Sequence, residues 1–276
     1  MPELPEVETI RRQLDALILG RNVTSLTASW DKTLNWLGVD EQQVIGHQVD
    51  SVSRRGKVII IALSSETSML IHLRMTGQLL LDENRDLEGR LTRAVIGLAS
   101  GQLVFNDQRK FGRIVVMPSN EVENDPLLRR LGPEPLSAEF TAQGLGACLA
   151  RHRTASVKAT LLDQSTLAGL GNIYVDEVLF TARLHPSTPS SVLTTREVKR
   201  LAEAIPQVLK AAIAAGGSTM RDYRDAAGAS GTYLDQALVF GRTGKPCRTC
   251  GRAIAKIRVA GRGTHVCATC QRLRPR

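Results

Sequence analysis

Four cysteines near the end of the chain form two pairs that could bind one metal ion. Cys247 and Cys250 form the first CxxC pair, Cys267 and Cys270 form the second, and 16 residues separate the pairs. Disulfides do not persist in a reducing cytosol, and two CxxC pairs at this spacing are typical of one tetrahedral zinc ion. The alternatives are an iron site or two redox pairs. We predict one structural zinc ion, since four thiolates leave no open coordination position.

Two other residues of types that can bind metal, one histidine and one cysteine, are not expected to be metal ligands. His265 lies between the cysteine pairs, but four thiolates already complete the shell, so we expect it on the surface. Cys148 stands alone in the sequence, and we expect it to be a small buried apolar residue.

The start of the chain, MPELPEVET, carries a second set of reactive groups. Met is normally removed before a small residue, and its removal would give Pro2 a free secondary amine. An α-amino group titrates near ~8 in model peptides, so a useful fraction is neutral and nucleophilic. The alternative, which the residue types alone favour, is that Pro2 only precedes a helix. Glu3 and Glu6 could transfer protons beside the amine, or could stabilise the helix N-terminus.

Positive charge is concentrated at the C-terminus. The formal net charge is +9, residues 241–276 hold ten Lys or Arg and no Asp or Glu, and the rest of the chain is nearly neutral. Such a segment attracts a polyanion in a salt-dependent manner, although a solvated basic tail is the usual explanation of a charge run.

Length and composition bound the class of protein. A chain of 276 residues with 42% hydrophobic residues can bury a core and suggests two domains. No stretch approaches the ~20 apolar residues that span a bilayer, and the N-terminus lacks the apolar run of a signal peptide. We therefore expect a cytoplasmic protein.

Two kinds of secondary structure must position these groups. Apolar residues at helical spacing predict a helix over 5–17, and short apolar runs between Gly, Ser, Asn and Asp turns predict strands over 23–117. The expected fold is α+β, with an N-terminal antiparallel β-sandwich flanked by helices. Further helices are predicted over 137–151, 156–163, 171–182 and 194–215.

These patterns suggest four consecutive parts. They are an N-terminal sandwich domain (1–131), a GPEPL linker (132–136), a helical domain (137–240) and a zinc ribbon (241–276). A polar loop at 217–233 falls within the third part.

Seven segments, taken together, resemble the formamidopyrimidine-DNA glycosylase family. They are MPELPEVET at the start, RRGK at 54–57, HLRMTGQL at 72–79, DQRKFGR at 107–113, LGPEPL at 131–136, GLGNIYVDEVLF at 169–180 and the cysteine segment. They occur in family order across the whole chain, and Leu4 stands where the sibling endonuclease VIII branch typically has Gly. The resemblance implies a helix–two-turn–helix motif and a β-hairpin zinc ribbon in the C-terminal part, with DNA between the domains.

The resemblance also implies a bifunctional DNA glycosylase and AP lyase that removes oxidised purines, such as 8-oxoguanine and formamidopyrimidines, from duplex DNA. Pro2 would form a Schiff base and β,δ-elimination would follow, with Glu3 transferring protons. The role of Glu6 stays open. Lys57 would reach the phosphate of the lesion and assist catalysis.

Three residues would enter the DNA. Alternate residues of a hairpin point the same way, so Arg109 and Phe111 could project together. The resemblance makes Phe111 a wedge, Arg109 the reader of the orphaned base, and Met75 the filler of the gap left by the flipped nucleotide. Phe111 and Met75 as ordinary core residues are the alternatives. Gln108 and Lys110 stand where the family often has Pro and Arg.

Three residues of the C-terminal part would contact DNA phosphates. Asn172 follows two glycines at a helix start, Lys158 begins the preceding helical stretch, and Arg262 lies midway between the cysteine pairs with glycine on both sides. We group Arg262 with the catalytic residues Pro2, Glu3 and Lys57.

Two other functions remain open at this point. One is the sibling activity on oxidised pyrimidines, against which Leu4 and the polar loop argue. The other is a zinc-ribbon DNA-binding protein without catalysis. The expected partner is damaged double-stranded DNA, with no membrane association, and we expect a monomer.

Overall fold

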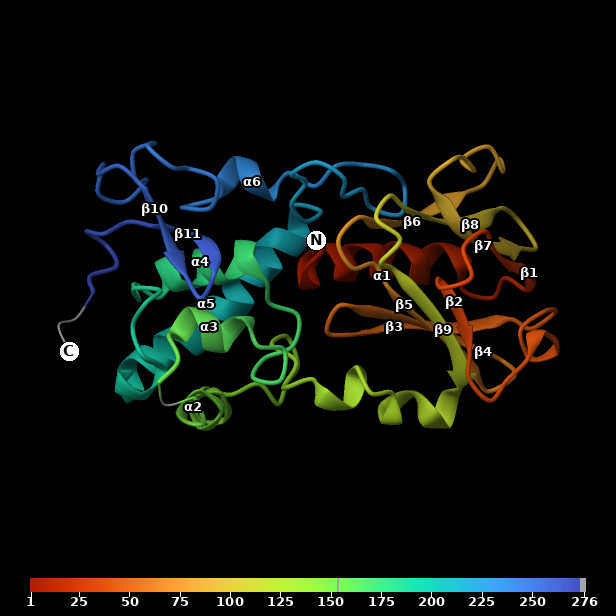
Figure 1. Ribbon diagram of the computed structural model, residues 1–276, viewed down its shortest axis with the longest axis horizontal. Coiled ribbons are helices and arrows are strands. Elements are labelled where there is room, and N and C mark those ends of the chain that lie inside the picture. Colours follow the sequence, from red (N-terminus) through yellow and green to blue (C-terminus); the bar gives the residue numbers. More distant parts are fainter. Residues whose placement is uncertain (153, 274–276) are drawn as a thin grey trace. The chain divides into compact units, whose positions relative to one another are not determined.

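The computed structural model describes residues 1–152 and 154–273, so the last three residues of the predicted ribbon lie outside the described residues (Figure 1). The chain forms two compact units. The first, the sandwich unit, comprises Met1–Arg129 and Ala215–Thr232, and the second, the helical unit, comprises Arg130–Ala214 and Tyr233–Arg276. Residues 215–232 are thus part of the sandwich unit, whereas the sequence pattern groups them with the helical part.

The sandwich unit begins with helix α1 (Leu4–Ile18), as the sequence predicts. A reciprocal capping box between Glu3 and Glu6 satisfies the first amides of the helix. The apolar stripe includes Val7, Ile10, Leu14 and Ile18, which are fully buried. Leu17 is exposed instead, since it lies on the other side of the helix.

Two sheets pack with α1 around one core, which confirms the predicted sandwich. The nine strands are β1 (Val23–Ala28), β2 (Leu34–Trp36), β3 (Val49–Arg55), β4 (Val58–Leu63), β5 (Thr67–His72), β6 (Gly77–Asp82), β7 (Thr92–Leu98), β8 (Gln102–Asp107) and β9 (Arg113–Pro118). Their order is β1-β7-β8-β6 in one sheet and β2-β9-β5-β4-β3 in the other. Pairing is antiparallel except between β2 and β9, which run parallel.

Two glycines fix the ends of the connections that carry candidate DNA-contacting residues. A Cβ at Gly77 would lie 2.3 Å from the carbonyl oxygen of Leu73, at the end of the β5–β6 connection. A Cβ at Gly112 would lie 2.3 Å from the ring of Phe105, at the end of the β8–β9 connection. A side chain at either position would collide with these atoms, so only glycine fits at the ends of the two connections.

The helical unit contains the helices predicted for it, with altered bounds. They are α2 (Ala142–Ala150), α3 (Val157–Leu162), α4 (Asn172–Thr181) and α5 (Thr195–Ala214), and a short helix that was not predicted, α6 (Tyr233–Gln236), follows. The first starts five residues later than expected, because Thr141 caps it by accepting a hydrogen bond from the amide of Gly144. One short 3₁₀ turn lies in this unit at Ser190–Val192; others lie at Glu41–Gln43 and Ser119–Asn124 in the sandwich unit and at Leu128–Arg130, where the sequence passes from one unit to the other.

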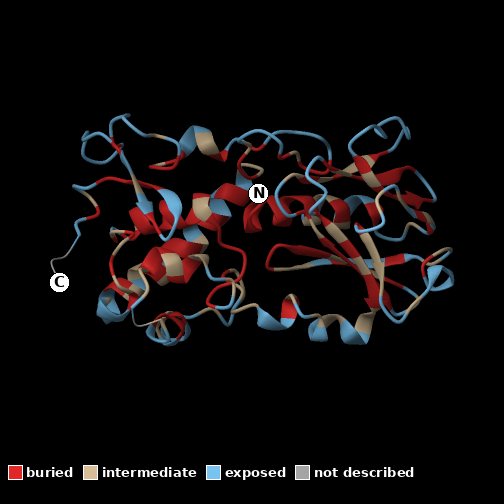
Figure 2. Cartoon of the chain, in the orientation of Figure 1, coloured by how far each residue is buried: buried red, intermediate tan, exposed pale blue. Residues whose placement is uncertain are grey.

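A β-hairpin of strands β10 (Ala255–Val259) and β11 (Arg262–Val266) follows in the helical unit. Helix α4 is a buried element of this unit, with Ile173 to Phe180 all buried (Figure 2). No helix in the described ranges is long and apolar enough to cross a membrane.

Candidate active site and DNA-contacting residues

The N-terminal segment is held in place by the carboxylate of Glu6. Pro2 is buried, and Glu3 and Glu6 are 4% and 1% exposed. One oxygen of Glu6 accepts a hydrogen bond from the amide of Glu3 and the other accepts one from the amide of Ser218, each at 2.7 Å. The Glu6 side chain therefore ties the residue after Pro2 to the start of the 215–232 segment, a connection that sequence patterns did not reveal.

Gly217 makes this tie possible. It has a φ of +84°, and a Cβ there would lie 2.8 Å from a carboxylate oxygen of Glu6. Both the left-handed backbone and the close approach exclude a side chain. The predicted polar loop is thus fixed at its first residues by α1, and the hydroxyl of Tyr223 adds a hydrogen bond to the carbonyl oxygen of Glu6 at 3.4 Å.

Lys57 lies at the β3–β4 hairpin, which a second carboxylate of α1 anchors. Arg54 pairs with Glu8 at 3.1 Å and donates to the carbonyl oxygen of Gly56 at 2.7 Å. Burial alone would raise the pKa of Glu8, but hydrogen bonds from three guanidinium groups outweigh it and lower that pKa. Glu8 is therefore ionised and orients the backbone directly before Lys57, which is itself buried.

His72 is a residue near Lys57 that the sequence did not single out. It ends β5 opposite Val58, the residue after Lys57. Burial, together with the positive charges of Arg74 and Lys57, lowers the pKa of His72 to about 3. The imidazole is therefore neutral, and its Nδ1 accepts a hydrogen bond from the amide of Arg74 at 3.0 Å. Only the register of β4 and β5 could have linked it to Lys57.

The three residues predicted to enter DNA are on turns of the sandwich unit. Met75 is 41% exposed and Phe111 is 48% exposed, so neither is a core residue. The guanidinium carbon of Arg109 lies 4.7 Å from the centre of the Phe111 ring. The two side chains project together, as the alternation along a hairpin predicts.

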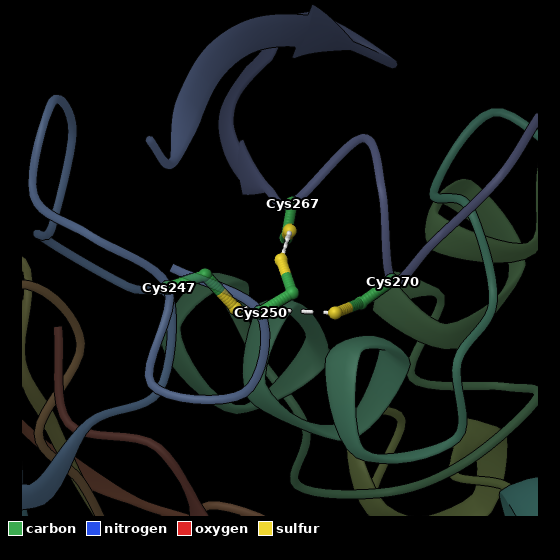
Figure 3. Close-up of side chains that lie close together, drawn as sticks. All are labelled: Cys247, Cys250, Cys267 and Cys270. Atoms are coloured by element: carbon green, nitrogen blue, oxygen red, sulfur yellow. Dashed lines mark hydrogen bonds between the residues drawn. The ribbon is translucent and has the colours of Figure 1, made fainter. Parts of the chain in front are cut away.

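The four cysteines of the helical unit point toward one another (Figure 3). All four sulfur atoms lie within 4.8 Å of one another. The Sγ–Sγ distance is 3.9 Å between Cys247 and Cys270 and 3.5 Å between Cys250 and Cys267. A tetrahedral site with Zn–S bonds of about 2.3 Å has sulfur–sulfur separations of about 3.8 Å. The cluster therefore fits one structural zinc ion.

The Cys247 thiol is prepared for metal binding by the turn that follows it. Burial raises its pKa, but hydrogen bonds from the amides of Thr249 and Cys250 outweigh this and lower the pKa to about 7. The amide of Thr249 lies 3.4 Å from the Cys247 sulfur. Such amides stabilise a thiolate and hence a metal–sulfur bond.

Asp176 in α4 holds the hairpin through a buried ion pair. Lys158 is fully buried, and its ammonium group lies 2.6 Å from Asp176 and 3.4 Å from the carbonyl oxygen of Gly263. The other oxygen of Asp176 accepts hydrogen bonds from the amide of His265 at 2.8 Å and from its ring at 3.3 Å. The expectation that His265 lies on the surface is wrong, because this carboxylate and the ring of Phe240 enclose it.

The neighbouring carboxylate, Glu177, anchors the segment that leads into the ribbon. It accepts hydrogen bonds from the amides of Leu238, Val239 and Phe240 at 2.8 to 2.9 Å. Burial raises the pKa of Glu177 despite these hydrogen bonds. Two adjacent acidic residues of α4 thus hold two different parts of the C-terminal segment.

Asn172 and Arg262 lie close together at one end of this arrangement. Asn172 is the first residue of α4, and its amide nitrogen donates to the carbonyl oxygen of Gly263 at 3.0 Å. Arg262 precedes Gly263 and is exposed at the turn of the hairpin. The N-terminus of a helix and an exposed guanidinium group are both suited to bind phosphate.

Comparison with known proteins agrees with this geometry. Family models match three segments: the formamidopyrimidine-DNA glycosylase N-terminal domain (residues 1–114), the formamidopyrimidine-DNA glycosylase H2TH domain (131–224) and the zinc finger found in FPG and IleRS (244–273). A formamidopyrimidine-DNA glycosylase of Desulfitobacterium hafniense is 42% identical over 98% of this chain and 100% of its own length. One of Streptococcus pyogenes is 43% identical over the whole of both chains.

The chain belongs to the formamidopyrimidine-DNA glycosylase family.

Solved structures of family members have the same fold. The MutM (Fpg) protein of Thermus thermophilus has a TM-score of 0.89 and 41% identity, over 99% of this chain and 100% of that one. A Lactococcus lactis Fpg mutant in complex with Fapy-dG-containing DNA has a TM-score of 0.90 and 37% identity, with the same coverage. The glycosylase fold therefore extends over nearly the whole chain.

Breaking the buried ion pair should destabilise the helical unit. We expect Lys158→Met to lower the free energy of unfolding by about 3–5 kcal/mol, because the substitution leaves Asp176 buried without its cation. Urea unfolding followed by circular dichroism measures the loss. Lys210→Met, which removes an exposed lysine of α5, is the control and should change stability by less than about 0.5 kcal/mol. Equal stability of the two variants would contradict a structural role for Lys158.

Proposed function

We propose that this chain is a base-excision-repair DNA glycosylase with AP lyase activity, which removes oxidised purines from duplex DNA. The observation that carries the proposal is the braced N-terminus, in which Glu6 holds Glu3 directly after a buried Pro2. Because the Glu6 carboxylate binds the amides of Glu3 and Ser218, this terminus has a fixed position, which a nucleophile needs. The contact with Glu3 alone is a helix capping box, so the second contact, with Ser218, is what favours a catalytic role over DNA binding without catalysis.

The proposed reaction starts when Met1 has been removed and Pro2 has a free amine. Its nitrogen attacks C1′ of the damaged nucleotide, the bond from C1′ to the base breaks, and the base leaves with a proton. The C1′–O4′ bond then breaks as O4′ takes a proton, which opens the sugar and leaves an iminium between C1′ and the Pro2 nitrogen. The iminium makes the C2′ proton acidic, so its loss expels the 3′ phosphate, and a second elimination expels the 5′ phosphate. We assign the proton transfers to Glu3 and the position of the amine to Glu6.

The other site residues would bind the DNA. We assign the phosphates of the lesion strand to Lys57, Asn172 and Arg262, with His72 beside Lys57 as a neutral partner. Lys158 is better assigned to positioning the hairpin, because its ammonium group is buried against Asp176. The zinc ion would hold the hairpin and take no part in the chemistry.

The remaining assignments concern organisation and location. We propose that the sandwich unit carries the nucleophile and the helical unit with its ribbon binds the DNA backbone, in place of the four consecutive parts expected from the sequence. Oxidised pyrimidines are the less favoured substrate, since the chain matches glycosylases named for formamidopyrimidine throughout. We propose a cytoplasmic, nucleoid-associated monomer.

The base opposite the lesion provides the test. An orphaned cytosine offers acceptors at O2 and N3 to the fork of Arg109, whereas adenine presents a donor at N6. We expect excision of 8-oxoguanine to be about ten- to a hundredfold faster opposite C than opposite A, from about 1–3 kcal/mol of discrimination. Arg109→Ala should weaken excision and flatten this preference, and Phe111→Ala should slow excision without changing it.

Single-turnover excision from the two duplexes measures both effects. If Arg109→Ala kept the full preference for cytosine, Arg109 would not be the reader of the partner base. Absence of excision from both duplexes by the wild-type chain would overturn the proposed function itself.

A further inference from the structure

One hydroxyl group connects the two turns that carry the candidate DNA-inserting residues. Thr76 follows Met75 on the β5–β6 connection, and Arg109 lies on the β8–β9 connection. The Thr76 hydroxyl donates to a carboxylate oxygen of Asp107 at 2.5 Å and accepts from the amide of Arg109 at 3.1 Å. The Thr76 side chain thus links the connection that carries Met75 to the backbone of Arg109.

Asp107 closes the second turn at both of its ends. The oxygen that Thr76 contacts also accepts a hydrogen bond from the amide of Arg109 at 3.1 Å, and the other oxygen accepts one from the amide of Gly112 at 2.7 Å. Asp107 is 1% exposed, so these donors replace the water that its carboxylate would otherwise bind. Arg109 and Phe111 therefore project from a turn whose backbone is held at a buried carboxylate.

The middle of the same turn is held by a different contact. Lys110 has a φ of +59°, in the left-handed region that few residues other than glycine adopt. Its ammonium group lies 4.0 Å from the centre of the Trp30 ring, a cation–π contact. With both ends and the middle fixed, the Thr76 hydroxyl is the side-chain contact that relates this turn to the connection of Met75, beside the backbone pairing of Gly77 with Asp107.

We propose that Thr76 is a positioning residue, which couples the filling of the void by Met75 to the reading of the partner base by Arg109. The inference rests on the proposed function, from which it takes the insertion of both turns into DNA. Without the hydroxyl, the Arg109 amide keeps the carboxylate of Asp107 and the pairing of Gly77 with Asp107 remains, but the side-chain contact between residue 76 and the Arg109 amide is lost. Discrimination between partner bases then falls, while the reaction at Pro2 continues.

The test compares Thr76→Val, which keeps the shape and removes the hydroxyl, with Thr76→Ser, which keeps the hydroxyl. The matched control is Thr92→Val, because Thr92 also donates one side-chain hydrogen bond, to Asn106, and accepts one from an amide, that of Gly89. We expect Thr76→Val to lower the preference for cytosine about tenfold. Thr76→Ser and Thr92→Val should both keep the preference of the wild type.

Two further measurements separate positioning from general damage to the protein. Borohydride trapping on DNA with a preformed abasic site should be the same for wild type and Thr76→Val. The fluorescence of 2-aminopurine placed beside the lesion, which reports unstacking, should rise less with Thr76→Val than with Thr76→Ser.

A double variant identifies the residue through which Thr76 acts. Thr76→Val combined with Arg109→Ala should show the same partner preference as Arg109→Ala alone. Full wild-type preference in Thr76→Val, failure of Thr76→Ser to restore it, or a further loss in the double variant would each overturn the proposal. If instead Arg109→Ala alone keeps the preference, the assignment of Arg109 fails first, and the role of Thr76 fails with it.

Discussion

Borohydride should cross-link this chain to DNA containing 8-oxoguanine through Pro2. A residue retained ahead of Pro2 should reduce the rate of cross-linking by a factor on the order of 10³ or more, which corresponds to an activation free energy higher by about 4 kcal/mol. A preceding residue converts the secondary amine into an amide, whose nitrogen is no longer a nucleophile. Pro2→Gly should also greatly reduce trapping, because it replaces the secondary amine and loosens the segment before Glu3. Trapping followed by peptide mapping identifies the linked residue.

Pro5→Ala is the matched control for these changes. Pro5 is a second buried proline, in the first turn of α1. Its nitrogen is always in a peptide bond, so it is never a free amine. We expect this variant to trap DNA as the wild type does. Full trapping with a blocked terminus would show that another amine is the nucleophile and would sink the proposed mechanism.

Loss of the metal should have the second large effect. We expect Cys267→Ser to lose its zinc and to raise the dissociation constant for DNA about 10²-fold or more, because binding of structural zinc supplies about 10–16 kcal/mol to the folding of small zinc domains. We expect the hairpin that carries Arg262 to depend on this metal. Most of the circular dichroism should remain, since α1, the sandwich and α2–α5 lie outside the ribbon.

Elemental analysis, cobalt substitution and DNA binding by anisotropy test this expectation together. Tetrahedral cobalt with four thiolates has characteristic absorption bands, which should be absent in Cys267→Ser. Cys148→Ser is the control, because Cys148 is a buried cysteine of α2 outside the cluster. An active protein purified without zinc would contradict the structural role of the metal.

The parts of the fold that could be predicted from the sequence are those with a local pattern. The spacing of Val7, Ile10 and Leu14 predicts α1, and the two CxxC pairs predict the cluster that the structure brings together. The parallel pairing of β2 could not be predicted, because a strand of three half-buried residues has no pattern that reports its partner.

The parts of the site that could not be predicted depend on distant partners. His265 is buried because Asp176, 89 residues earlier, accepts two of its hydrogen bonds, and Lys158 is buried by the same carboxylate. Glu6 meets Ser218, 212 residues away. Each of these residues is of a polar type that usually lies on the surface, and only the fold supplies the hydrogen-bond partner that permits its burial.

The return of residues 215–232 to the sandwich unit has a consequence for the order of folding during synthesis. The chain crosses from one unit to the other three times, after Arg129, after Ala214 and after Thr232. Because the N-terminal strands leave the ribosome first, the sandwich can collapse early, but Glu6 gains its second hydrogen bond only once Ser218 has emerged. Closing a loop of this length has an entropic cost that a local contact does not have. The brace at Glu6 is thus complete only after Ser218 has been made, so a nascent or truncated sandwich that ends before this residue lacks one of the two contacts on which the proposed chemistry depends.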